Sequence, residues 1–122
     1  MIDASSRLPN PATGKGTAMA KTLLFVESAP ISPDRAEDYH AWQERTHIPE
    51  MLGIDGFTGA RRWRADDGES FITLYEIDAD IDTARANLKK ALQGGKLSKP
   101  VAVQMQPPPV QRYLTFVDEA TR

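Results

Sequence analysis

The stretch Trp42-Gln43-Glu44-Arg45-Thr46-His47-Ile48-Pro49-Glu50-Met51-Leu52, followed by Gly56-Phe57, says most about the fold of this chain. Pro49 has no backbone N–H and disfavours α geometry at the residue before it, so the pattern predicts that a helix ends at about His47. An imidazole at a helix end, just before a turn into a strand, is held firmly and can face a cleft. Because its ordinary pKa is near ~6.5, it can exchange protons at physiological pH. His47 is therefore the candidate general acid or base.

The segments on either side of this stretch alternate between strand and helix patterns. Ser32-Pro33-Asp34 provides a capping hydroxyl and a proline for the start of the first helix, and Asp66-Asp67-Gly68 is typical of a hairpin turn. Asp80 can cap a second helix that Gly94-Gly95 ends. The expected strands are residues 21–28, 57–64, 70–77 and 110–117, and the expected helices are residues 33–47 and 80–93. The order β-α-β-β-α-β predicts an α+β, ferredoxin-like fold, an antiparallel four-stranded sheet with both helices on one face.

Composition excludes several classes of protein. The chain has 122 residues and no cysteine, so it can form no disulfide, thiolate metal site or cysteine nucleophile. Its net charge of −2 argues against nucleic acid as a partner. No apolar run approaches the ~20 residues that span a bilayer, so we expect no membrane association and a cytoplasmic location. No complete dinucleotide-binding or Walker pattern occurs, so we expect no bound dinucleotide or nucleoside triphosphate as a cofactor. No nucleophile elbow occurs either, so we expect no hydrolase triad. We expect residues 1–20 to be a flexible N-terminal extension and residues 21–118 to form one domain.

Both faces of the expected sheet are apolar, although the helices cover only one. The residues of one parity are Leu24, Val26, Phe71, Thr73, Tyr75 and Ile77, and those of the other are Leu23, Phe25, Ile72, Leu74, Leu114 and Phe116. An uncovered apolar sheet needs a second cover, and the simplest is another copy of the chain. The sequence therefore predicts a homodimer with two sheets packed face to face. The segment of residues 96–109, rich in proline, is a further candidate for contact with a neighbouring copy.

The helix-end His47-Ile48-Pro49-Glu50-Met51-Leu52, the following Gly56-Phe57, and the strand segments at residues 60–63 and 73–76 resemble the dimeric α/β-barrel superfamily, and within it the EthD-type proteins. The resemblance covers roughly residues 21–118. It implies a dimeric ferredoxin-like fold with a pocket between the sheet and helices of each subunit, and it places His47 on the helix-end histidine of the family. Members include cofactor-free monooxygenases, polyketide cyclases, lactone isomerases, haem-binding proteins and stress-response proteins, so the resemblance fixes no single reaction.

Several further residues are candidates for contact with a substrate. Arg61 lies on one face of the second strand, with Arg62 and Arg64 on the other, and an arginine that faces the pocket can hold a carboxylate or phenolate. Alternatively, these arginines serve only to keep an edge strand soluble. Tyr75, Trp63 and Phe71 are assigned to one face as pocket walls, with the Tyr75 hydroxyl as a hydrogen-bonding group; the alternative for all three is core packing.

Histidine and acidic side chains suggest three other interpretations. His40, Glu44 and His47 recur at helical spacing, which predicts a single stripe of three candidate metal ligands, although helix surfaces often carry such triplets by chance. His40 or His47 is also a candidate axial ligand for haem. On the open face of the sheet, Glu27 and Glu76 are expected to pair with Arg62 or Arg112.

The leading interpretation is an enzyme that transforms a hydrophobic, aromatic or polyketide-like small molecule by cyclisation, isomerisation, dehydration or oxygenation without a dissociable cofactor. His47 moves the proton, while Tyr75, Arg62, Arg61, Trp63 and His40 bind the substrate. A non-catalytic small-molecule-binding or accessory protein is the alternative from a different class, and haem binding is the third.

Overall fold

The computed structural model describes residues 22–122, so the prediction of a flexible extension at residues 1–20 lies outside the described residues. The described elements are β1 (Thr22–Ser28), η1 (Pro33–Arg35), α1 (Ala36–Trp42), η2 (Gln43–His47), α2 (Ile48–Met51), β2 (Phe57–Arg64), β3 (Phe71–Ile77), α3 (Ile81–Gln93) and β4 (Val110–Thr115). The strands differ from the predicted ones by at most two residues at an end. This agreement arises because the turn signals between them are local.

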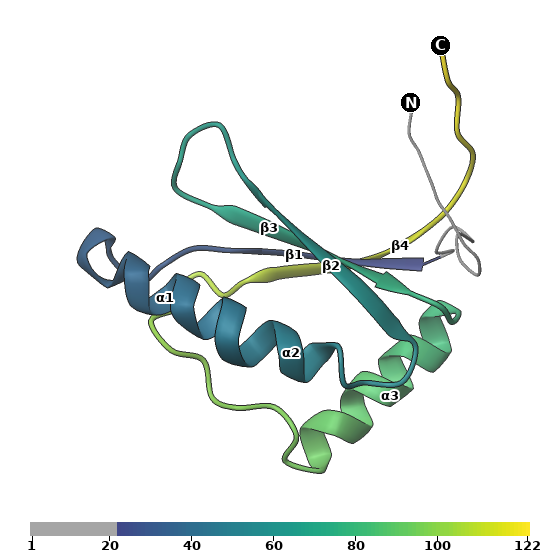
Figure 1. The fold of residues 1–122 in the computed structure, drawn as a ribbon, viewed down its shortest axis with the longest axis horizontal. Coiled ribbons are helices and arrows are strands. Elements are labelled where there is room, and N and C mark those ends of the chain that lie inside the picture. The colour runs from purple at the N-terminus through teal and green to yellow at the C-terminus, as the bar shows by residue number, and fades with distance from the viewer. Residues whose placement is uncertain (1–21) are drawn as a thin grey trace.

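The four strands form one sheet in the order β2-β3-β1-β4, in which all neighbours are antiparallel. The helices α1, α2 and α3 lie together on one side of this sheet (Figure 1). Element order, strand order and the single helical layer confirm the predicted α+β, ferredoxin-like fold.

The helix that contains His47 does not end where the sequence predicts. Helical backbone continues through Ile48, at φ −63° and ψ −46°, and reaches Met51. Pro49 is tolerated because η2 is a turn of π-helix, in which the N–H of Ile48 bonds to the carbonyl of Gln43, five residues back. This wider turn relieves the clash that a proline ring makes with the carbonyl four residues before it.

Not all of the predicted helix-end residues act as predicted. Ser32 occupies the N-cap of η1, but its hydroxyl makes no capping hydrogen bond to the backbone. Asp80 caps α3 as predicted, because its Oδ1 accepts from the N–H of Thr83 at 2.8 Å. Gly95 follows α3 with a φ of +70°, a conformation that suits glycine.

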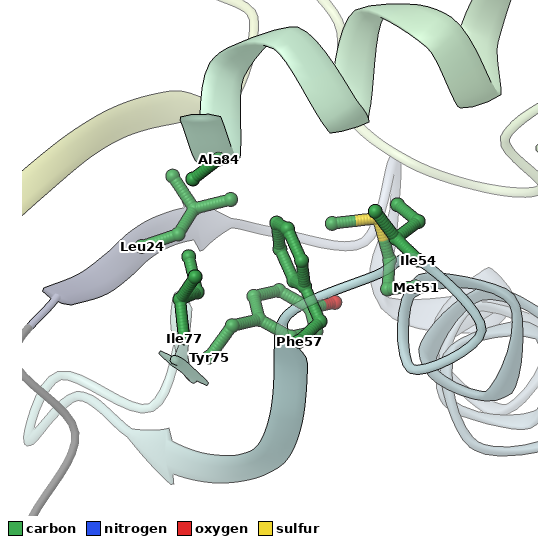
Figure 2. Close-up of a cluster of buried hydrophobic side chains, with 7 residues drawn as sticks. All are labelled: Leu24, Met51, Ile54, Phe57, Tyr75, Ile77 and Ala84. Carbon is green, nitrogen blue, oxygen red and sulfur yellow. The ribbon is translucent and has the colours of Figure 1, made fainter. Parts of the chain in front are cut away.

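The main core lies between the sheet, the end of α2 and α3 (Figure 2), and consists of Leu24, Met51, Ile54, Phe57, Tyr75, Ile77 and Ala84. A second, smaller cluster under α1 joins Tyr39, Trp42 and Val103. Along α3, Ala84 is fully buried and Leu88 packs against the main core, whereas Leu92 is 59% exposed.

Strand register decides which side chains face the helices. Arg62 pairs with Thr73, and Trp63 pairs with Ile72. Directly opposed residues of antiparallel strands share a face, so Arg62 points to the helical side with Tyr75, whereas Trp63 points to the open side. The prediction that Trp63 shares a face with Tyr75 and Phe71 is therefore wrong, and Trp63 is 55% exposed.

No helix among residues 22–122 is both long enough and apolar enough to cross a membrane.

The burial of two leucines gives a matched test of this core. Leu24 is completely buried and Leu92 is 59% exposed. Leu24→Ala should lower the free energy of unfolding by about 2–5 kcal/mol, because it leaves a cavity in the main core. Leu92→Ala should change it by less than about 0.5 kcal/mol. Urea unfolding followed by circular dichroism measures both, and similar losses in the two variants would contradict this description of the core.

Candidate functional site

A cavity of about 300 Å³ lies beside His47, and we call it the His47 cavity. Its walls come from β1, β4, the helix at α1 and η2, and the segment between α3 and β4. The lining residues are Val26, Ser28, Trp42, Gln43, His47, Pro100, Val103, Met105, Pro108, Pro109 and Gln111. The volume is at the lower end of the range for small-molecule sites, ~300–1,000 Å³.

The outer wall of this cavity is the crossover segment, residues 94–109, which joins α3 to β4. The N–H of Ile31 bonds to the carbonyl of Ala102 at 2.7 Å, and the N–H of Gln104 bonds to the carbonyl of Ala29 at 2.9 Å. Val103 fills the cluster under α1 and is only 7% exposed. Residues 102–104 of the predicted arm therefore pack against the chain's own β1 end and are unavailable to a neighbouring copy.

His47 forms part of the cavity wall as a ring stacked on Trp42. The two ring centroids are 4.6 Å apart, with 16° between the planes. The Nδ1 atom of His47 is buried and has no hydrogen-bond partner among the described residues. Burial lowers the pKa of His47 below its usual value, and the carboxylate of Glu50 partly opposes this shift. The imidazole is therefore held neutral at neutral pH, the state in which it can accept a proton.

Trp42 is a site residue that is not among the candidates taken from the sequence. It is 9% exposed, it lines the cavity, and its Nε1 is buried without a partner among the described residues. A buried N–H that has no acceptor is costly and calls for an explanation, for which a ligand site is one. Residues five apart do not share a face of an α-helix, so the pairing of Trp42 with His47 gives no signal in the sequence and follows only from the π-turn.

A second group of side chains, the Arg62 cluster, lies under α1 beside β2 and β3. It consists of Tyr39, His40, Arg62 and Phe71. The Nη2 of Arg62 is 3.0 Å from Nδ1 of His40, and its guanidinium carbon is 5.9 Å and 5.8 Å from the ring centroids of Tyr39 and Phe71. Because a guanidinium only donates, His40 accepts this bond on Nδ1. Burial and the adjacent Arg62 charge both lower the pKa of His40, while Glu44 opposes them.

One hydrogen bond connects the Arg62 cluster to the His47 cavity. The Tyr39 hydroxyl lies 2.6 Å from Oγ of Ser28, and Ser28 lines the cavity. Tyr75 also faces the helical side, but it is only 1% exposed and belongs to the main core. Burial raises the pKa of its hydroxyl, so Tyr75 stays protonated at any physiological pH.

The remaining predicted binding residues lie elsewhere. Arg61 is on the open face of the sheet, where its Nε is 3.9 Å from Oε2 of Glu76 and the two side chains are 69% and 39% exposed. Glu76 thus meets Arg61 and not the predicted Arg62 or Arg112. Glu27 accepts a hydrogen bond from the hydroxyl of Ser70 at 3.0 Å. Neither Arg61 nor Trp63 lies on the side of the sheet that holds His47.

His40 and His47 do not form the common stripe that helical spacing predicts. The ring of His40 packs edge-on against Phe71 of β3 at 4.6 Å, whereas His47 stacks on Trp42 beside β1 and β4. The π-turn between them is the cause, because it changes the number of residues per turn. Within residues 22–122, no three of His, Asp and Glu lie close enough together to hold a metal ion.

Comparison with known proteins supports the fold. No protein-family model and no curated protein matches the chain. Among solved structures, Rv0793 from Mycobacterium tuberculosis is similar with a TM-score of 0.51 and 20% identity, over 82% of this chain and 98% of that one. A monooxygenase from the gene ActVA-Orf6 of Streptomyces coelicolor, solved in complex with the ligand Nanaomycin D, has a TM-score of 0.55 and 12% identity, over 84% and 93%. At these identities the likeness concerns the fold, and no match distinguishes an EthD-type protein.

The burial of His47 makes a prediction about its titration. Its midpoint, followed by NMR of the imidazole Hε1 proton, should lie below ~6.5, and Glu50→Gln should lower it further because an attractive charge is lost. Since the unfolded chain binds this proton at a higher pH, the free energy of unfolding should fall as the pH drops below about 6.5. Glu37→Gln, an exposed change on α1, is the control. A midpoint at or above ~6.5 would show that His47 is open to water.

Proposed function

We propose that this protein is a small-molecule enzyme that acts in the His47 cavity on a hydrophobic, aromatic or polyketide-like compound. The observation that carries the proposal is a cavity of about 300 Å³ with the stacked rings of His47 and Trp42 in its wall. Val26, Val103, Met105 and three prolines supply most of the remaining surface, which suits an apolar ligand. The similarity in fold to a monooxygenase that binds Nanaomycin D supports the same general kind of activity.

In this proposal His47 is the catalytic residue. Burial keeps its imidazole neutral, so it can take a proton from a bound substrate and return it to another atom. The surrounding apolar wall excludes water and holds the substrate near the ring, which lowers the entropic cost of reaching the transition state. A reaction of this kind, whether cyclisation, isomerisation, dehydration or oxygenation, needs no dissociable cofactor for its proton-transfer step.

The Arg62 cluster supplies the polar end of the proposed site. Among the described residues no carboxylate pairs with Arg62, and its Nε is buried without a partner. A partly buried guanidinium without a counter-ion favours an anionic group nearby. Tyr39 and Ser28 connect this charge to the cavity, and in this proposal it stabilises, through them, negative charge that develops on a substrate.

A binding experiment followed by a product assay separates the enzyme from its alternative, a non-catalytic binding protein. In a Trp63→Phe background Trp42 is the only tryptophan, since the chain has two. Nanaomycin D and a panel of hydroxylated naphthoquinones and aryl ketones should quench its fluorescence saturably. For an enzyme, His47→Asn should slow product formation, measured by mass spectrometry, by ~10²-fold or more while the dissociation constant changes less than about threefold.

The control for this experiment is Lys89→Ala, an exposed change on α3. Saturable binding with no product in any variant would indicate the binding protein instead. Failure of every compound to bind would contradict the proposal that the His47 cavity is a ligand site.

We also propose that two copies pair through the open face of the sheet. Its apolar side chains include Leu23, Phe25, Ile72, Leu74, Leu114 and Phe116, and Phe116 is 45% exposed. Such a surface lacks a covering layer within residues 22–122, because all helices of that part lie on the other side (Figure 1).

Light scattering after gel filtration tests the pairing. The wild-type chain should have twice the mass of one copy, which is 13.5 kDa. Leu74→Lys, at the centre of the open face, should give the mass of a single copy, because a buried unpaired charge is unfavourable. Leu92→Lys, on the exposed part of α3, should leave the dimer intact. A wild-type mass of 13.5 kDa would refute the dimer.

A further inference from the structure

The crossover segment is attached to the rest of the chain at three places. One attachment is the pairing of residues 102–104 with residues 29–31, which includes two backbone hydrogen bonds and the buried side chain of Val103. A second is the partly buried Leu97, which packs against the main core. The third is polar and exposed. There the carboxylate of Glu50 accepts from the N–H of Ser98 at 2.9 Å on Oε1 and from the Ser98 hydroxyl at 2.5 Å on Oε2.

The polar attachment is the weakest of the three. Ser98, Lys99 and Pro100, which follow Leu97, are exposed. The bond to Glu50 spans 48 residues of sequence. Segments held by few buried contacts open locally before the core does.

The polar attachment is close in sequence to the wall of the His47 cavity. Pro100, two residues after Ser98, lines that cavity, whereas Glu50 lines a different one. Glu50 is three residues after His47 on the same helix, and its charge acts on the His47 imidazole. A movement of Ser98 away from Glu50 can therefore carry Pro100 out of the cavity wall.

We propose that the Glu50–Ser98 pair is a latch that holds residues 98–101 against the His47 cavity, and that its release is the route by which a ligand reaches His47. Glu50 is in this respect a positioning residue that acts through the crossover segment. The buried attachment at residues 102–104 stays closed and serves as the hinge. The role for ligand access rests on the function proposed above, whereas the latch itself can be tested without a ligand.

The first measurement is acrylamide quenching of Trp42 in the Trp63→Phe background. Glu50→Ala removes both hydrogen bonds and should raise the quenching constant about threefold or more, while Ser98→Ala, which keeps the amide bond, should raise it less. Ser98→Thr keeps the hydroxyl and should restore the wild-type value. Glu37→Ala, an exposed glutamate on α1, should have no effect.

The second measurement is amide hydrogen exchange, which separates a local opening from general unfolding. In Glu50→Ala the Ser98 amide should exchange about tenfold faster or more, whereas the Gln104 and Ile31 amides should keep their protection. If the Glu50→Ala chain fails to fold, the comparison of Ser98→Ala with Ser98→Thr decides the question.

Unchanged quenching in Glu50→Ala and Ser98→Ala, or equal loss of protection at Ser98 and Gln104, would overturn the latch. Because neither measurement uses a ligand, failure of the latch would leave the proposed function standing. Conversely, a latch that opens as expected would survive a failure of every compound to bind.

Discussion

The structure depends on how the helix accommodates Pro49. A proline in a helix removes one hydrogen bond and pushes against the carbonyl four residues earlier, here that of Arg45. The chain accommodates the proline with a single π-turn over Gln43–His47, in which the N–H of Ile48 bonds to the carbonyl of Gln43. The helix therefore continues to Met51, and Met51 can enter the main core. Had the helix ended at His47, neither the position of Met51 nor the orientation of the imidazole would follow.

The same turn sets the geometry of the candidate site. It separates His40, which packs against Phe71 and Arg62, from His47, which stacks on Trp42. The result is one polar cluster toward β2 and β3 and one aromatic pair toward β1 and β4, joined by the bond between Tyr39 and Ser28. Buried polar atoms without partners occur in both, at Arg62 Nε, Trp42 Nε1 and His47 Nδ1. Buried polar atoms without hydrogen-bond partners destabilise the folded chain. Their concentration in this region is consistent with a ligand site, because polar atoms of a ligand can pair with them.

Sequence reasoning recovered the elements of the fold and only part of the site. The hairpin turn, the cap at Asp80 and the strand patterns are local signals, and the structure agrees with them. The end of the first helix was wrong, because the rule for proline describes an α-helix and the chain uses a π-turn. Trp63 was assigned to the same face as Tyr75, and Arg62 was a candidate partner of Glu27 and Glu76 on the open face; the register of β2 with β3 places each on the opposite side. The fold-back of residues 102–104 depends on pairing with residues 29–31, a long-range contact that no local pattern reveals.

The helices and strands contribute differently from the crossover segment to the shape of the His47 cavity. The likeness of this chain to the two solved structures, at 20% and 12% identity, concerns the fold. The His47 cavity takes its histidine and tryptophan from the helix at α1 and η2, but nearly half of its lining comes from the crossover segment. Loops tolerate changes in length and sequence far better than the elements they join. Under the proposed function, the helix would therefore supply the proton-transferring group, whereas the crossover segment would set the size and shape of the molecule that fits beside it.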